Sequence, residues 1–493
     1  MEIVSTALSQ ALKYFHYFMY SSAQSGFFFV MNCIVGLSAP FFHQKLGVSF
    51  ETINLVICGV YQIVILLLQP LIGMISDYFP LVRFKRRFLL VMGTITLTVA
   101  LPLIGFCDVI GKAIENVDND NSSSSVATGC TTIVGAVIGF VFVFIASIGY
   151  SFIQSPSRAI IIDITPKEEQ NSANFIASMT SGFSAVLFYL IAAIFTISPN
   201  YYPSMFLLST IVIVLTVLIT CLFAHEKKST EIENLETESP VNEQKTEIER
   251  TGFSENSKIN ENIALISSTS PDNTNNNKLT MFGRIKEVLT PKILLLYFLT
   301  FLSMTAFGGL GINICNFYST NLYHASPCDE EYNVGVSMAL YGMAIMSFFQ
   351  MIFSVVLPIL KHQNFVFVFS LGLACVSFCG YIIINELQLE ETAMDPWMLF
   401  FSFLCCAGIG MLGTCLYSIP FILIHKLSQK NHIGIAISIL VSFLQLGISF
   451  AGVAFTMLLL FFDSLVVVMY FSAVVSFIGA VAAFFILRFI NPN

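Results

Sequence analysis

The sequence predicts an all-α polytopic membrane protein in which twelve helices cross the bilayer. Of its 493 residues, 56% are hydrophobic and only 11% are charged, whereas soluble domains carry about 25% charged residues. Apolar runs long enough to cross a bilayer, which takes about 20 residues, recur along the whole chain. The distribution of basic residues independently favours an even number of spans. These observations exclude the soluble classes of protein.

Each expected span is an apolar run between two polar breaks. The first run is too long for a cleavable signal peptide and lacks a small-residue cleavage site, so we interpret it as a span. The twelve expected spans are residues 17–42, 53–76, 88–107, 132–156, 173–196, 203–224, 291–316, 335–360, 365–385, 397–424, 433–460 and 465–488.

Basic residues gather in alternate connections between these spans. With the amino terminus in the cytosol, only Lys45 and Lys112 of the 22 Lys and Arg residues fall on the outer side. The positive-inside rule therefore predicts that both termini are cytosolic. The formal net charge of −8 indicates no nucleic-acid partner. We expect an integral, multi-pass protein whose particular membrane the sequence does not specify.

A polar segment divides the spans equally. Residues 225–290 are rich in Glu and Asn and cannot bury enough apolar surface to fold, so they predict a disordered cytosolic linker. The linker is either a simple tether or a regulatory docking site. Residues 1–224 and 291–493 then form two six-helix halves, a design typical of alternating access around a site near the middle of the bilayer.

The fourth expected span ends in Ser155-Pro-Ser-Arg-Ala159. An arginine inside a span is costly, and Pro156 frees a backbone carbonyl, so the segment indicates a functional region. Gln154 lies one helical turn before Arg158 on the same face, and the two side chains are candidates to bind the polar groups of a ligand. Alternatively, Arg158 is a positive-inside anchor. Asp163 follows as a candidate coupling or gating acid, or as the partner of Lys167 at a helix end.

Gly73 and Asp77 close the second span, and Arg83 and Arg87 lie where the third begins. Glycine permits close helix approach, and an acid facing a basic cluster is able to latch one conformation. The simpler interpretation is that the basic cluster anchors the loop in the cytosol.

Neutral polar side chains inside the spans suit a neutral polyhydroxylated solute, although each is also able to join helices by hydrogen bonding. Tyr150, Phe307 and Tyr417 are candidates for stacking on an apolar face of such a solute. The polar candidates are Gln24, Asn32, Gln62, Gln154, Asn313, Asn316, Gln350 and Gln445.

Several segments together resemble the major facilitator superfamily, and within it the sucrose/proton symporter branch, which is related to the glycoside–pentoside–hexuronide transporters. The resemblance covers both halves. It implies a transporter of a neutral, sucrose-like sugar with substrate contacts from Gln24, Gln154, Arg158, Asn313 and Tyr417. The matching segments are Gln24-Ser-Gly26, Leu68-Gln-Pro70, Gly73-Met-Ile-Ser-Asp77, Arg83-Phe-Lys-Arg-Arg87, Gln154-Ser-Pro-Ser-Arg-Ala159, Tyr332-Asn-Val-Gly-Val336 and Tyr417-Ser-Ile-Pro-Phe421.

The sequence departs from this family where the family usually carries acids thought to move the coupled proton. Those positions hold Ser147, Gly311 and Asn313, and Phe50 stands in place of an external histidine. Because Ser and Asn do not carry a proton near neutral pH, we expect weak coupling or facilitated diffusion. A proton is the candidate coupling ion, and no cofactor or metal is expected.

Other classes of function remain open at this point. An intramembrane enzyme would need paired catalytic groups, which the sequence does not show, because its seven His residues are scattered. Within the transporter class, the alternatives are another solute or sodium coupling, and outside it a non-transporting sensor. A small-molecule sugar and the lipid bilayer are the expected partners of a monomer.

Overall fold

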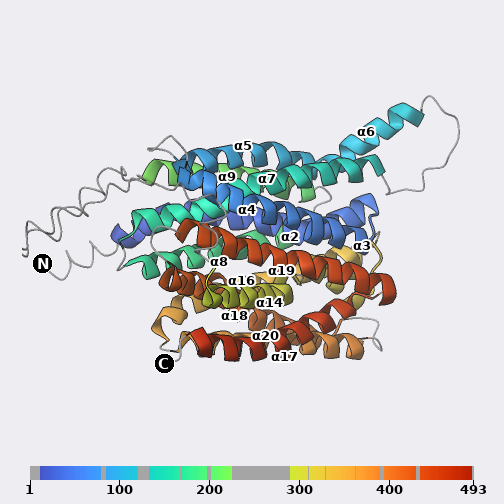
Figure 1. Ribbon diagram of the computed structural model, residues 1–493. Helices are drawn as coiled ribbons and strands as arrows, with labels where there is room; N and C mark the ends of the chain where they lie inside the picture. Colours follow the sequence, from blue (N-terminus) through green and yellow to red (C-terminus); the bar gives the residue numbers. More distant parts are fainter. Residues whose placement is uncertain are drawn as a thin grey trace, which may run out of the picture.

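The computed structural model describes residues 12–78, 85–119, 133–166, 169–196, 201–224, 289–308, 310–327, 329–360, 362–388, 394–428, 433–462 and 464–490. All regular elements within these ranges are helical. Twelve of the helical stretches are long and apolar enough to cross a membrane. The prediction of an all-α, multi-pass membrane protein is therefore confirmed, as Figure 1 shows.

The first six spans are built from elements that precede residue 225. The second span is composite, because a short helix, a π-helical segment and a longer helix follow one another without a break. The elements are α2 (Ser22–Leu46), α3 (Phe50–Ile53) with η1 (Asn54–Val60) and α4 (Tyr61–Tyr78), α5 (Lys85–Gly105), α7 (Ile133–Ile164), α8 (Gln170–Phe195) and α9 (Tyr201–Phe223).

The last six spans follow residue 290, and within the seventh only residue 309 lies outside the described part. The elements are α14 (Pro291–Gly308), α15 (Leu310–Asn316) with η3 (Phe317–Leu322), α16 (Glu330–Val356) with η4 (Leu357–Ile359), α17 (Gln363–Gln388), α18 (Pro396–Leu427), α19 (Ile433–Phe462) and α20 (Val466–Ile490).

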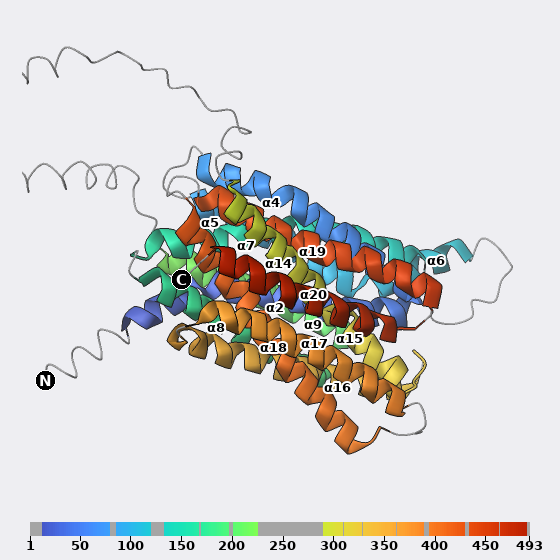
Figure 2. The ribbon, with the colours of Figure 1, turned by 60° about the horizontal axis from the view of Figure 1, so that its bottom comes forward.

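The two ends of the bundle are distinct. Helix α2 begins and α20 ends at one end, which we call the terminal face, and the additional helix α6 (Cys107–Asn119) projects from the other, which we call the α6 face (Figures 1 and 2). The sequence did not predict α6, because its alternating polar and apolar residues lie outside the apolar runs. The distribution of basic residues predicts that the terminal face is cytosolic, and this stays a prediction. Of the expected linker, residues 225–288 lie outside the described part.

The fourth span differs from its expected end at residue 156. Helix α7 continues through Pro156 to Ile164, and Ile160 and Ile161 beyond the proline are buried. Burial of these apolar side chains favours continuation of the helix, although proline removes one backbone hydrogen bond. Arg158 is consequently a residue inside a helix rather than in a loop.

Helices from the two sides of the linker pack along three seams. Helix α8 lies along α16, η1 and α4 lie along α19, and α2 packs against α15. These seams leave a space at the centre of the molecule, where α2, α8, α14, α15, α16 and α18 face one another.

Candidate functional site: a central neutral pocket

A pocket lies between the helices that precede the linker and those that follow it. Helices α2, α4 and α8 provide one wall, and α14, α15, α16, α18 and α19 provide the other. The lining residues are Phe28, Met31, Asn32, Val35, Gln62, Ser181, Ala185, Tyr189, Met304, Phe307, Gly308, Leu310, Gly311, Ile312, Met343, Met346, Ser347, Gln350, Tyr417 and Ile448.

The seventh span contributes several residues to the wall of this pocket. Gly308 ends α14, Leu310 begins α15, and both residues line the pocket together with Gly311. The pocket lies between the two sets of six spans, where proteins built from two membrane halves commonly bind their substrates. This position makes the pocket the candidate functional site.

The polar groups of the pocket are all neutral. Side-chain amides come from Asn32, Gln62 and Gln350, and hydroxyl groups come from two serines and two tyrosines. No charged side chain lines the pocket among the residues that the structure describes. The remaining surface is apolar and includes the flexible side chains of four methionines. Such a surface suits an uncharged solute that offers both hydroxyl groups and apolar faces.

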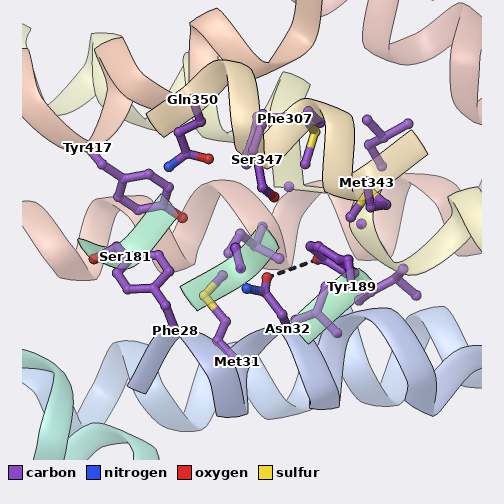
Figure 3. A pocket seen from close by; sticks show the side chains of 18 of the residues that line it. Phe28, Met31, Asn32, Ser181, Tyr189, Phe307, Met343, Ser347, Gln350 and Tyr417 are labelled. Atoms are coloured by element: carbon purple, nitrogen blue, oxygen red, sulfur yellow. Dashed lines mark hydrogen bonds between the residues drawn. The ribbon is translucent and has the colours of Figure 1, made fainter. Parts of the chain in front are cut away.

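Two of the amides each have one hydrogen-bonding atom without a partner in the described part of the chain. The hydroxyl of Tyr189 donates to Oδ1 of Asn32 at 2.9 Å, which orients the Asn32 amide (Figure 3). Within the described ranges, Nδ2 of Asn32 and Oε1 of Gln62 have no hydrogen-bond partner. Since a buried polar group without a partner costs about 1–3 kcal/mol, both atoms are favourable positions for a ligand group.

Aromatic side chains border the pocket on its terminal side. The rings of Phe28 and Tyr417 meet edge to face, with centroids 5.4 Å apart, and join α2 to α18 across the two halves (Figure 3). One helical turn further along α18, Phe421 lies under the guanidinium of Arg158, whose Cζ atom is 4.2 Å from the ring centroid. Arg158 therefore lies beyond the aromatic pair and does not line the pocket.

Of the five substrate-binding residues predicted from the sequence, Tyr417 lines the pocket and the other four do not. Gln154 accepts hydrogen bonds from Gln69 at 2.7 Å and from Gln445 at 3.4 Å, so it links three helices. Gln24 is 1% exposed, and within the described part its amide has no partner. Arg158 contacts Phe421 as described above.

Asn313 lies on the opposite side of the pocket from Arg158. It exchanges two hydrogen bonds with Asn54, of 2.9 and 3.0 Å, in a buried amide pair. This pair joins η1 to α15 and therefore connects the two halves toward the α6 face.

Three of the four expected latch residues are described, and they lie at the terminal face. Gly73 and Asp77 are in the last turns of α4, and Arg87 is in the first turn of α5. Arg83 lies outside the described residues, as do the side chains of Asp77 and Asp163. The latch and the coupling role of Asp163 stay predictions.

Carboxylates are confined to the edges of the membrane-spanning region. Within the twelve candidate spans the only acids are Glu51, Glu330, Glu331 and Glu386, all of which lie within three residues of a span end. Ser147 is fully buried, and its hydroxyl donates to the backbone carbonyl of Phe144 at 2.6 Å. Among the described residues, no three His, Cys, Asp or Glu gather as metal ligands.

Twelve candidate spans arranged around a central neutral pocket define a multi-pass membrane protein built from two sets of six helices. The Major Facilitator Superfamily profile matches residues 20–420, and the chain belongs to this superfamily. The expectation drawn from the motif resemblance is therefore confirmed at the level of the superfamily.

Curated relatives match only part of the chain. Sucrose transport protein SUC3 of Arabidopsis thaliana is 24% identical over 170 residues, which is 32% of this chain and 28% of that protein. Sucrose transport protein SUT5 of Oryza sativa subsp. indica is 26% identical over 161 residues, which is 32% of this chain and 29% of that protein. The matches thus span less than a third of either relative.

Solved structures match over nearly the full length. A D-xylose-proton symporter superposes with a TM-score of 0.62 at 14% identity and covers 96% of this chain and 97% of its own. A point mutant of the nucleoside transporter NupG gives a TM-score of 0.58 at 11% identity, with 96% and 99% covered. At these identities the likeness establishes the fold alone.

Proposed function

We propose that the protein carries a neutral sugar, a sucrose-like glycoside, across its membrane by alternating access through the central pocket. The observation that carries the proposal is the chemistry of the pocket, in which amides, hydroxyls and aromatic rings surround a space with no charged side chain among the described residues. The hydroxyl groups of a sugar form hydrogen bonds with amides and hydroxyls, and the apolar face of its ring packs on aromatic rings. The sucrose transport proteins among the relatives support the same class of solute.

Contacts on both sides of the pocket support the alternating-access part of the proposal. Toward the α6 face, Gln44 donates to Asn333 at 3.0 Å across the halves, and the Asn54–Asn313 pair lies deeper. Toward the terminal face, Phe28 meets Tyr417, and the hydroxyls of Ser178 and Ser418 are 3.3 Å apart. These are neutral contacts worth about 1 kcal/mol each, so either set is able to break as the other forms.

We further propose that proton coupling is weak or absent. A coupled proton would gain about 2.3 kcal/mol per 100 mV of membrane potential, which corresponds to roughly fiftyfold accumulation of a neutral solute. Carrying it requires a group that titrates within the translocation path. Ser147, Gly311 and Asn313 are not ionisable near neutral pH.

Uptake of radiolabelled sucrose and maltose into proteoliposomes tests the transport proposal. We expect saturable uptake of at least one of these sugars, inhibited by an excess of the unlabelled sugar and missing from protein-free liposomes. Radiolabelled uridine serves as the comparison solute, because a nucleoside transporter shares the fold. Uptake of uridine without sugar uptake would assign another solute to the pocket. Absence of saturable uptake for all three would contradict the proposal and favour a non-transporting sensor.

A further inference from the structure

A second cleft opens at the terminal face, away from the central pocket. It lies between the start of α17, the end of α18 and the end of α20, which pack side by side as Figure 2 shows. His362, Lys426 and Arg488 line it, together with the amide of Asn364. The site is independent of the proposed sugar transport.

The charge of this cleft is unbalanced. His362, Lys426 and Arg488 are all exposed, and no described carboxylate lines the cleft or forms an ion pair with them. Two permanent cations and a histidine that converge on one space favour an anion, and the guanidinium of Arg488 presents donors in a geometry that suits a phosphate group.

The cleft also has an apolar border that faces away from the protein. Phe365 and Phe484 line it and are 66% and 49% exposed. The spans of α18 and α20 end at Leu427 and Ile490, next to Lys426 and Arg488. The cleft is therefore at the boundary of the bilayer, at the depth where headgroup phosphates meet acyl chains.

We propose that this cleft binds the headgroup of an anionic phospholipid. Lys426, Arg488 and His362 hold the phosphodiester, the Asn364 amide donates to it, and the acyl chains run along Phe365 and Phe484. The apolar border distinguishes this ligand from a free inorganic anion, which would gain nothing from two exposed rings. The predicted cytosolic location of the terminal face agrees, because anionic lipids concentrate in the cytoplasmic leaflet.

The test is a titration of the full-length protein in neutral detergent with short-chain phosphatidylglycerol, followed by native mass spectrometry and thermal unfolding. We expect the lipid to bind and to raise the unfolding temperature. In the double variant Lys426→Gln/Arg488→Gln, affinity should fall about thirtyfold, given the attraction of each basic residue near an anionic surface. Lys112→Gln, which removes an exposed charge from α6 on the opposite face, should bind the lipid as the unmodified protein does.

A second variant separates a lipid from a simple anion. Phe484→Ser keeps every charge, so it should weaken phosphatidylglycerol binding while leaving any binding of glycerol phosphate unchanged. Glycerol phosphate or inorganic phosphate that binds as tightly as the lipid would overturn the proposal in favour of an anion site. Equal binding of phosphatidylcholine, or unchanged lipid affinity in the Lys426→Gln/Arg488→Gln variant, would also overturn it.

Discussion

At the scale of single residues, Tyr417 contributes both a ring and a hydroxyl group to the wall of the central pocket. Tyr417→Phe removes the hydroxyl and keeps the edge-to-face contact with Phe28. One hydrogen bond to a neutral solute contributes about 0.5–1.5 kcal/mol, so we expect the KM for sugar uptake to rise roughly two- to twelvefold. The measurement is the concentration dependence of uptake in proteoliposomes.

Tyr381→Phe is the matched control for this prediction. Tyr381 is fully buried, its hydroxyl donates to the backbone of Ser402 at 3.0 Å, and it does not line the pocket. The control should lower thermal stability and leave KM unchanged. Equal KM changes in the two variants would show that Tyr417 acts on the whole fold and not on the solute.

Glu169 offers a prediction that depends on pH. Lys13 and Tyr17 both donate to its carboxylate, and these hydrogen bonds lower the pKa of the Glu169 carboxyl. A depressed folded-state pKa gives stability that is present above the ordinary carboxyl pKa and is lost as the pH falls through the folded-state value.

Glu169→Gln should therefore unfold at a slightly lower temperature than the unmodified protein at neutral pH. The difference should be small, because the ion pair is exposed to solvent, and it should disappear in acid below the folded-state pKa. Thermal unfolding in one detergent at several pH values measures it. A difference that persists undiminished in acid would mean that the carboxylate charge is not its cause.

At the scale of elements, the seam between α19 and η1 depends on a glycine. A Cβ atom at position 452 would lie 2.1 Å from Cβ and 2.8 Å from the carbonyl carbon of Cys58, so the two backbones would have to separate. We expect Gly452→Ala to destabilise the protein by about 1–3 kcal/mol, as overpacking of a core does. Thermal unfolding in detergent is the measurement.

Gly372→Ala is the control, because a Cβ atom at position 372 in α17 meets nothing within 4 Å. Alanine is the better helix former by about 1 kcal/mol, so this variant should unfold at the same temperature as the unmodified protein or above it. Equal unfolding temperatures for the two alanine variants would contradict the close packing of α19 on η1.

The spans were predictable because few backbone conformations are stable inside a bilayer. A chain in hydrocarbon must satisfy its own hydrogen bonds, so an apolar run of sufficient length predicts a helix almost by itself. The end of α7 was harder to predict, because a proline followed by an arginine suggests a stop. Burial of Ile160 and Ile161 depends on neighbouring helices that are distant in sequence.

The site was only partly predictable. Asn32, Gln62 and Gln350 were among the polar candidates, but sequence alone does not show which side chains face the same space across the two halves. Gln154 illustrates the difficulty, since its hydrogen bonds from Gln69 and Gln445 make it a link between helices in this structure. Nothing in the sequence indicated that Phe28 lines the pocket, because Phe is abundant throughout the chain.

At the scale of the whole molecule, the described acids of the spans lie near the ends of the helices and the central pocket carries only neutral groups. These facts support the proposal that the two halves move a neutral sugar between the two faces without a titrating group in the path. Such a carrier equilibrates its solute and does not concentrate it.

The most direct test of this claim is sucrose accumulation in proteoliposomes under an inward proton gradient and a negative internal potential. The account predicts that internal sucrose rises to the external concentration and stops there, with the same endpoint when a protonophore is added. Accumulation well above the external concentration that the protonophore abolishes would contradict it. That result would show a working proton path despite Ser147 and Asn313.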